Sequence, residues 1–286
     1  MNMGKLSKIL TFAVFSAAAV WVNGLPAEQG LEEGTDQVME TVSDCDHSCC
    51  NDDKRVARVL FNDVWGELVE KYGEKGIVLP KQVVFLNGAP GAGKGTNTVT
   101  VMRTLEIPNK PVEVSSLLNT PECEKLKEKG MLVGDDIVVS LVLNELLKPE
   151  NARGVIIDGF PRTAVQAHFL KFLIQKLKGD NEPIFRMVNF SVSRRTSVIR
   201  QLSRGDAAVE QNKKAEAEGA KKVPVRATDL SPEAAARRYQ IYEKSIGECI
   251  SILNGALELY EINAEGAYKE VRNRTRDILS REHQDQ

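Results

Sequence analysis

One short stretch restricts the possible folds of this chain more than any other: an apolar run that leads straight into a glycine-rich loop. Residues 82–87 read QVVFLN, and residues 88–96 read GAPGAGKGT. A segment compatible with a helix follows. A buried strand, a tight loop and a helix in that order are typical of an α/β fold with a parallel sheet.

The loop itself is suited to binding phosphate. It consists of Gly88, Ala89, Pro90, Gly91, Ala92, Gly93, Lys94, Gly95 and Thr96. Its glycines allow positive φ angles, so successive backbone N–H groups can point at one centre, and the N-terminus of the next helix attracts anions. Lys94 would reach the β- and γ-phosphates of a nucleoside triphosphate. The alternative is a glycine-rich turn with a surface lysine.

Further short β-branched runs alternate with segments of helical periodicity. The strand candidates are residues 82–87, 111–114, 154–157, 184–190 and 257–262. Five strands joined by crossover helices predict a doubly wound α/β domain with a five-stranded parallel sheet, spanning residues 80–286. Residues 206–222 are rich in Ala, Glu and Lys without an apolar stripe, so we expect a solvated helix or a flexible arm there.

The N-terminal region has a different character. Lys5 and Lys8 precede an apolar run of 14 residues, 9–22, which ends near Gly24. This layout is typical of a secretory signal peptide over residues 1–24. The alternative is an uncleaved membrane anchor, although the run is shorter than the roughly 20 apolar residues that span a bilayer. A signal peptide would make the protein periplasmic or secreted; without one it would be cytoplasmic. Membrane contact is expected only through this segment, if it stays uncleaved.

Residues 25–79 are expected to connect this segment to the domain. Residues 25–53 are rich in Glu, Asp, Gly and Ser and predict an acidic tether. Residues 54–72 predict an amphipathic helix that docks onto the domain. The apolar face expected for this helix consists of Val56, Val59, Leu60, Val64, Trp65, Leu68 and Val69.

Three of the five cysteines are close together in the tether. Cys45, Cys49 and Cys50 surround His47, whereas the other two cysteines lie far along the chain. A zinc site is one reading, because thiolates and imidazole suit that metal. Adjacent cysteines rarely point into one tetrahedron, and an exported chain tends to oxidise them. We therefore favour a local or intermolecular disulfide.

A second motif points to a nucleotide substrate. Residues 154–167 read GVIIDGFPRTAVQA. Asp158, at the end of a strand, can order water around Mg²⁺, and Arg162 presents a planar fork to a phosphate. Gln166, one helical turn further on, can hydrogen-bond an adenine edge. Together with the loop, this segment resembles the motifs GxPGxGKGT and DGFPRTxxQA of the adenylate kinases, which are nucleoside monophosphate kinases of the P-loop class.

The resemblance covers residues 80–280. It implies a P-loop nucleoside-triphosphatase-like three-layer fold with a mobile lid at residues 205–228 and a monophosphate-binding arm at residues 114–134. It also implies the reaction ATP + AMP ⇌ 2 ADP, with ATP and Mg²⁺ as cofactors and Asp158 holding the metal through water. We expect a monomer. The net charge of −2 gives no reason to expect a nucleic acid partner.

The resemblance also assigns site residues. The cations expected to stabilise the transferring phosphoryl group are Lys94, Arg162, Arg204, Arg226 and Arg238. ATP would be held by residues 88–96, by Arg204 and by the backbone near Gly266. The acceptor would contact Met131, Leu132, Val133, Gly159, Phe160, Pro161, Arg162, Gln166, Arg226 and Arg238. Arg237 is an alternative register for Arg238, and Arg200 is expected to lie on a solvated face.

The chain departs from the family pattern at the acceptor side. Val114 and Asn119 replace a threonine that touches the base and an arginine that grips the monophosphate. Loss of one charge-assisted hydrogen bond would weaken acceptor binding by roughly 1.5–3 kcal/mol. Two alternatives therefore stay open: a nucleotide-binding regulatory module with a weakened acceptor site, and a kinase for another nucleoside monophosphate.

The expected lid is of intermediate length, because 21 residues lie between Arg204 and Arg226. These residues contain no cysteine, so the lid lacks a zinc staple.

Overall fold

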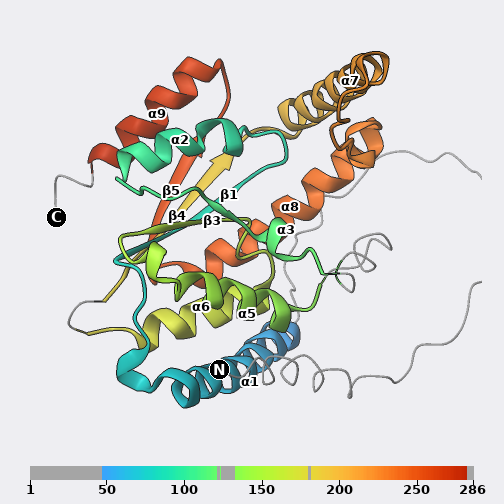
Figure 1. The fold of residues 1–286 in the computed structure, drawn as a ribbon. Helices are drawn as coiled ribbons and strands as arrows, with labels where there is room; N and C mark the ends of the chain where they lie inside the picture. The colour runs from blue at the N-terminus through green and yellow to red at the C-terminus, as the bar shows by residue number, and fades with distance from the viewer. Residues whose placement is uncertain (1–46, 121–122, 124–132, 180–181, 282–286) are drawn as a thin grey trace, which may run out of the picture. The chain divides into compact units, whose positions relative to one another are not determined.

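Five parallel strands form the centre of the fold, and helices cover both faces of the sheet (Figure 1). The computed structural model describes residues 47–120, 123, 133–179 and 182–281. The predicted signal peptide, most of the predicted tether and Cys45 lie outside these ranges. Among the helices that are described, none combines the length and apolar character needed to cross a bilayer.

The strands are arranged in the order β2-β3-β1-β4-β5. Their bounds are β1 Gln82–Gly88, β2 Val112–Glu113, β3 Val155–Asp158, β4 Ile184–Ser191 and β5 Glu258–Asn263. In the central register, Phe85 of β1 pairs with Ile157 of β3 on one side and with Met187 of β4 on the other. All five predicted strands are confirmed, and no end is shifted by more than one residue.

Eight α-helices are described and surround this sheet. They are α1 His47–Tyr72, α2 Lys94–Thr104, α3 Val114–Leu117, α5 Asp135–Leu146, α6 Ala164–Lys176, α7 Arg194–Glu218, α8 Pro232–Leu253 and α9 Tyr268–Arg281. Three short 3₁₀ turns are η1 Glu74–Gly76, η2 Pro149–Asn151 and η3 Ala227–Asp229. Residues 206–218 form the largely exposed end of α7, as the solvated-helix prediction requires, and Gly219 caps the helix with a φ of 64°.

Alternation along β1 divides the core into two halves. Val83 and Phe85 point into a cluster formed with α1, α5, α6 and α8, whereas Val84 and Leu86 point into a cluster formed with α2 and α9. All four side chains are fully buried. A strand buried on both faces is characteristic of a parallel sheet between two helical layers, so the predicted three-layer α/β fold is confirmed.

The predicted docking helix is present, and its buried face agrees with the predicted one in part: Val64 and Leu68 are buried as expected. Its buried residues are Ala57, Phe61, Val64 and Leu68, spaced as one helical stripe. Val56 and Val59, which were expected on that face, are 50% and 57% exposed, so this part of the prediction was wrong. The reason is a contact with α6. The Phe169 ring of that helix meets Phe61 edge-on at 5.6 Å between centroids, and this contact fixes the rotation of α1.

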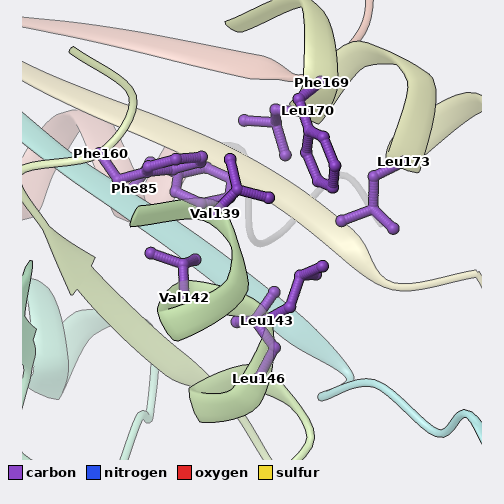
Figure 2. A pocket seen from close by; sticks show the side chains of 9 residues that line it. All are labelled: Phe85, Val139, Val142, Leu143, Leu146, Phe160, Phe169, Leu170 and Leu173. Atoms are coloured by element: carbon purple, nitrogen blue, oxygen red, sulfur yellow. The ribbon is translucent and has the colours of Figure 1, made fainter. Parts of the chain in front are cut away.

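A small apolar cavity lies in the first half of the core, between β1, α5 and α6 (Figure 2). The residues that line it are Phe85, Val139, Val142, Leu143, Leu146, Phe160, Phe169, Leu170 and Leu173. No charged or hydrogen-bonding side chain faces it. It is therefore a packing gap rather than a place for a phosphate, and the candidate site lies elsewhere, at the carboxyl ends of the strands.

Candidate active site

The glycine-rich loop leaves β1 and turns directly into α2. The backbone N–H of Ala89 donates to the carbonyl of Phe190 at 3.0 Å, which ties the loop to the neighbouring strand. Gly91 and Gly93 have φ angles of 75° and 79°, in the left-handed region that favours glycine. Gly93 is the N-cap, so the first N–H groups of α2, which have no acceptor within the helix, open toward the loop.

Lys94 lies near several other positive charges. Its ammonium lies 4.0 Å from Asp158 Oδ1 at the end of β3. The surrounding protein displaces water from the ammonium and lowers the pKa of Lys94, and three nearby guanidinium groups lower it further, while Asp158 acts in the opposite direction. These guanidinium groups belong to Arg162, Arg238 and Arg226. Counting Asp229, which lies 3.3 Å from Arg238, two carboxylates face these four cations, and the remaining positive charge suits a polyphosphate.

Arg162 is positioned by the turn that follows β3. Gly159 has a φ of 92°, and its N–H donates to Leu86 O at 3.2 Å. A side chain at Gly159 would collide with the Arg162 guanidinium, so glycine lets this arginine fold back over the turn. The peptide between Phe160 and Pro161 is cis, and both residues are buried. The turn therefore presents Arg162 at the same sheet edge as the glycine-rich loop.

Gln166 is buried beside Arg162, and the protein engages both ends of its amide. Its Oε1 accepts from the backbone N–H of Arg162 at 2.8 Å, and its Nε2 donates to Asp135 Oδ1 at 2.8 Å. Thr163 caps α6 and donates its hydroxyl to the same Asp135 oxygen at 2.9 Å. Burial raises the pKa of Asp135, against these hydrogen bonds. Asp135 was not among the predicted site residues.

Asp229 holds two of the predicted arginines. Arg204 makes a bidentate pair with it, with Nε to Oδ2 at 2.7 Å and Nη2 to Oδ1 at 2.8 Å. Arg238 Nη1 lies 3.3 Å from Oδ1. Burial alone would raise the pKa of Asp229, but the Arg204 hydrogen bond and the surrounding guanidinium charges lower it overall. Arg226 is exposed at the start of η3, and Arg237 is exposed on α8.

A close approach of two backbones makes this pairing possible. At Gly205, directly after Arg204, an added Cβ would collide with the carbonyl oxygen of Asp229. Glycine at this position therefore lets α7 and η3 come together. Asp229 was also missing from the predicted site, and the only sequence signal for it was its place in the segment RATD.

Arg200 corrects a further expectation. It does not lie on a solvated face: its Nη1 donates to Ala264 O at 3.1 Å and its Nη2 donates to Gly266 O at 3.1 Å. A longer contact of 3.4 Å joins Nη1 to Gly91 O. Gly266 itself has a φ of 97°. Arg200 thus links the glycine-rich loop to the segment between β5 and α9, where the nucleotide base is expected.

The acceptor side is described in part. Met131 and Leu132 lie outside the described residues, while Val133 is half-buried. Val114 is buried and packs in the core, and Asn119 is exposed. Thr96, the last loop residue, is also exposed. The described part of the arm therefore offers an amide and no positive charge where the family has an arginine.

Comparison with known proteins agrees with this geometry. The sequence model of adenylate kinase matches residues 86–255. The chain is 31% identical over 207 residues to an adenylate kinase of Xanthomonas oryzae pv. oryzae (strain MAFF 311018), covering 69% of this chain and 99% of the relative. It is 30% identical over 207 residues to adenylate kinase 1 of Nostoc sp. (strain PCC 7120), covering 69% and 98%. The chain belongs to the adenylate kinase family, whose members are phosphotransferases of the nucleoside monophosphate kinase type.

Proposed function

We propose that the protein transfers the γ-phosphoryl group of ATP to AMP and so forms two molecules of ADP. The observation that carries this proposal is the convergence of Lys94, Arg162, Arg226 and Arg238 at one edge of the sheet. Burial is the largest cause that lowers the pKa of Lys94, and the positive charges of the three arginines lower it further, so a bound polyphosphate would stabilise the charged ammonium. Two nucleotides that meet at their phosphate ends supply that charge.

The donor nucleotide would lie along the glycine-rich loop. The first N–H groups of α2 and the Lys94 ammonium would contact its β- and γ-phosphates. Its base would lie near Gly266, whose backbone Arg200 already holds. Arg204, which Asp229 orients, would face the phosphates from the other side. The donor therefore fits between β1 and α7.

The acceptor would lie on the side of β3. Arg162 would grip its phosphate through two parallel hydrogen bonds, the geometry in which a guanidinium is most selective. The buried amide of Gln166 holds the backbone of Arg162, and Val133 would border the base. Gln166 can contact the base only through the hydrogen-bonding capacity that its protein partners leave unused.

Mg²⁺ fits this site as a phosphate-bound ion. In the part of the chain that is described, no group of three His, Cys, Asp or Glu side chains could cage a metal. Asp158 nevertheless places one partly exposed carboxylate 4.0 Å from Lys94, beside the loop. Mg²⁺ keeps several waters and prefers oxygen ligands, so Asp158 would hold it through water. When bound, the ion would neutralise phosphate charge.

The transfer requires no general base. A phosphate oxygen of the acceptor is already anionic; it attacks the γ-phosphorus of ATP, the bond from that phosphorus to the β–γ bridging oxygen breaks, and ADP leaves. The task of the protein is positioning and charge stabilisation. Lys94 and the arginines would provide both, and closure of the lid segment would exclude water, so that the phosphoryl group is not lost to hydrolysis.

Two observations on the acceptor side support alternatives to phosphoryl transfer to AMP. Asn119 is exposed and carries no charge, which favours a nucleotide-binding module with weak acceptor binding. Val114 is buried and offers no polar contact to a base, which leaves room for another nucleoside monophosphate. Neither observation affects the donor side.

A coupled assay of ADP formation from ATP with Mg²⁺ tests the proposal, with AMP, CMP, UMP and GMP as acceptors in parallel. We expect AMP to give the highest kcat/KM. Calorimetric binding of ATP accompanies the assay. ATP binding without turnover on any acceptor would favour the regulatory module, and a higher kcat/KM for another monophosphate would identify a different kinase. Either outcome contradicts the proposal.

A further inference from the structure

A chain of buried polar groups connects the glycine-rich loop to α7, which runs into the lid segment, and to α8, which follows that segment. Ser197 of α7 donates its hydroxyl to Pro90 O at 2.7 Å. Gln201, one turn further along α7, donates its Nε2 to Ser197 Oγ at 3.1 Å and to Ala235 O of α8 at 3.2 Å. Ser197 and Gln201 are completely buried. We call Pro90, Ser197, Gln201 and Ala235 the loop–lid network.

The loop–lid network contains a buried polar atom that lowers the stability of the fold. Gln201 Oε1 is buried and has no hydrogen-bond partner among the residues that are described. A buried polar atom without a partner costs free energy that an apolar side chain of similar size would avoid. Such a group at a functional site points to a role other than stability.

The network acts on the direction of one backbone N–H group. The carbonyl of Pro90 and the N–H of Gly91 belong to the same planar trans peptide, so they point in opposite directions. Ser197 holds that carbonyl, and therefore it also sets where the Gly91 N–H points. The helix lies close enough that an added Cβ on Gly91 would come within 3.1 Å of Ser197 O. The loop consequently takes its orientation from α7.

The same contacts set the positions of Arg204 and Arg238. Arg204 follows Gln201 by three residues on α7, and Arg238 follows Ala235 by three residues on α8. Residues three apart lie on neighbouring positions of one helix surface. Because Gln201 bonds both helices, it fixes the separation between these arginines and the loop.

We propose that Ser197 and Gln201 are positioning residues that align the phosphate-binding N–H groups of the loop with Arg204 and Arg238. The inference rests on the proposed function, because it places the donor phosphates between the loop and these arginines. It predicts a larger effect on ATP than on the acceptor, because the loop and Arg204 are assigned to ATP alone. Among the described residues, no hydrogen bond joins the network to Arg162 or Gln166, which would hold the acceptor.

Ser197→Ala and Gln201→Met test this proposal. Loss of a neutral hydrogen bond should raise KM for ATP by roughly 2- to 12-fold in each variant, while KM for the acceptor changes less than twofold. Gln201→Met should at the same time keep or raise the midpoint of urea unfolding, because it removes the unpartnered oxygen. A purely structural role would not raise KM for ATP in a protein that is equally or more stable. Ser203→Ala, at an exposed position of α7, is the matched control and should leave both KM values unchanged.

Two results would overturn the proposal: KM for ATP within twofold of the unaltered protein in both variants, or equal increases in KM for ATP and for the acceptor. Calorimetric titration with ATP separates this failure from failure of the proposed function. If the unaltered protein binds ATP but phosphorylates no acceptor, the proposed function is wrong, and a weaker ATP affinity in Ser197→Ala and Gln201→Met still supports the network. If the protein turns over and the variants bind ATP with unchanged affinity, the network proposal is wrong.

Discussion

Arg237 and Arg238 are adjacent on α8, yet their surroundings differ. Arg238 lies 3.3 Å from Asp229 and is one of the cations that lower the pKa of Lys94. Arg237 is exposed. We expect Arg238→Ala to lower kcat by about 10²–10³-fold, the cost of removing one donor that stabilises the transition state. Arg237→Ala should stay within twofold.

Steady-state kinetics at saturating ATP and acceptor distinguish the two arginines. Circular dichroism confirms that both variants are folded, so a change in kcat reports on the chemistry. Equal losses of kcat in the two variants, or a larger loss for Arg237→Ala, would contradict the assignment of Arg238 as the arginine that acts on the phosphates.

The residues that sequence reasoning found are those whose role follows from local spacing. Lys94 and Arg162 stand at fixed places in contiguous motifs, and each lies where its motif implies, at the carboxyl edge of the sheet. Asp229, Asp135 and Arg200 depend on partners 25 to 66 residues away. Arg200 binds backbone carbonyls, and any residue type supplies such an acceptor, so no sequence pattern marks the contact.

At the scale of elements, the strands were predictable and the rotation of α1 was not. The strands β1, β3 and β4 are short apolar runs that are buried on both faces, so their positions do not depend on choosing a face. In α1, apolar residues occur on more than one side, and the sequence of the helix alone does not say which side is covered. Phe169 and Phe172 of α6 decide this by contacting Phe61.

The docking of α1 gives a prediction at this scale. Phe61 is buried against two rings of α6, so Phe61→Ala should lower the free energy of unfolding by about 3–5 kcal/mol. Val59→Ala, on the exposed side of the same helix, should change it by no more than about 0.5 kcal/mol. Urea unfolding followed by circular dichroism measures both. A larger loss for Val59→Ala would place the docking face where the sequence pattern first suggested.

At the scale of the whole domain, the site lies where the order of the strands changes direction. The chain passes from β1 to β2 and β3 on one side and then to β4 and β5 on the other, so the carboxyl end of β1 is the switch point of the sheet. Open α/β sheets bind ligands at this crevice. The donor side draws on β1, α7 and α8, and the acceptor side draws on β3 and α6. A ligand that bridges both would contact elements from both halves of the sheet.

This arrangement predicts that one ligand stabilises the entire described domain, including the docked helix. A dinucleotide polyphosphate with an adenosine at each end, at 100 times its Kd, should raise the free energy of unfolding by about 2.7 kcal/mol. Trp65 reports on α1. The chain contains two tryptophans, so the background substitution Trp21→Phe leaves Trp65 as the single fluorescent tryptophan. Its fluorescence transition and the circular dichroism transition should move together, since α1 shares one apolar cluster with the central strand. If the ligand shifts the circular dichroism midpoint but leaves the Trp65 midpoint unchanged, α1 unfolds independently of the site.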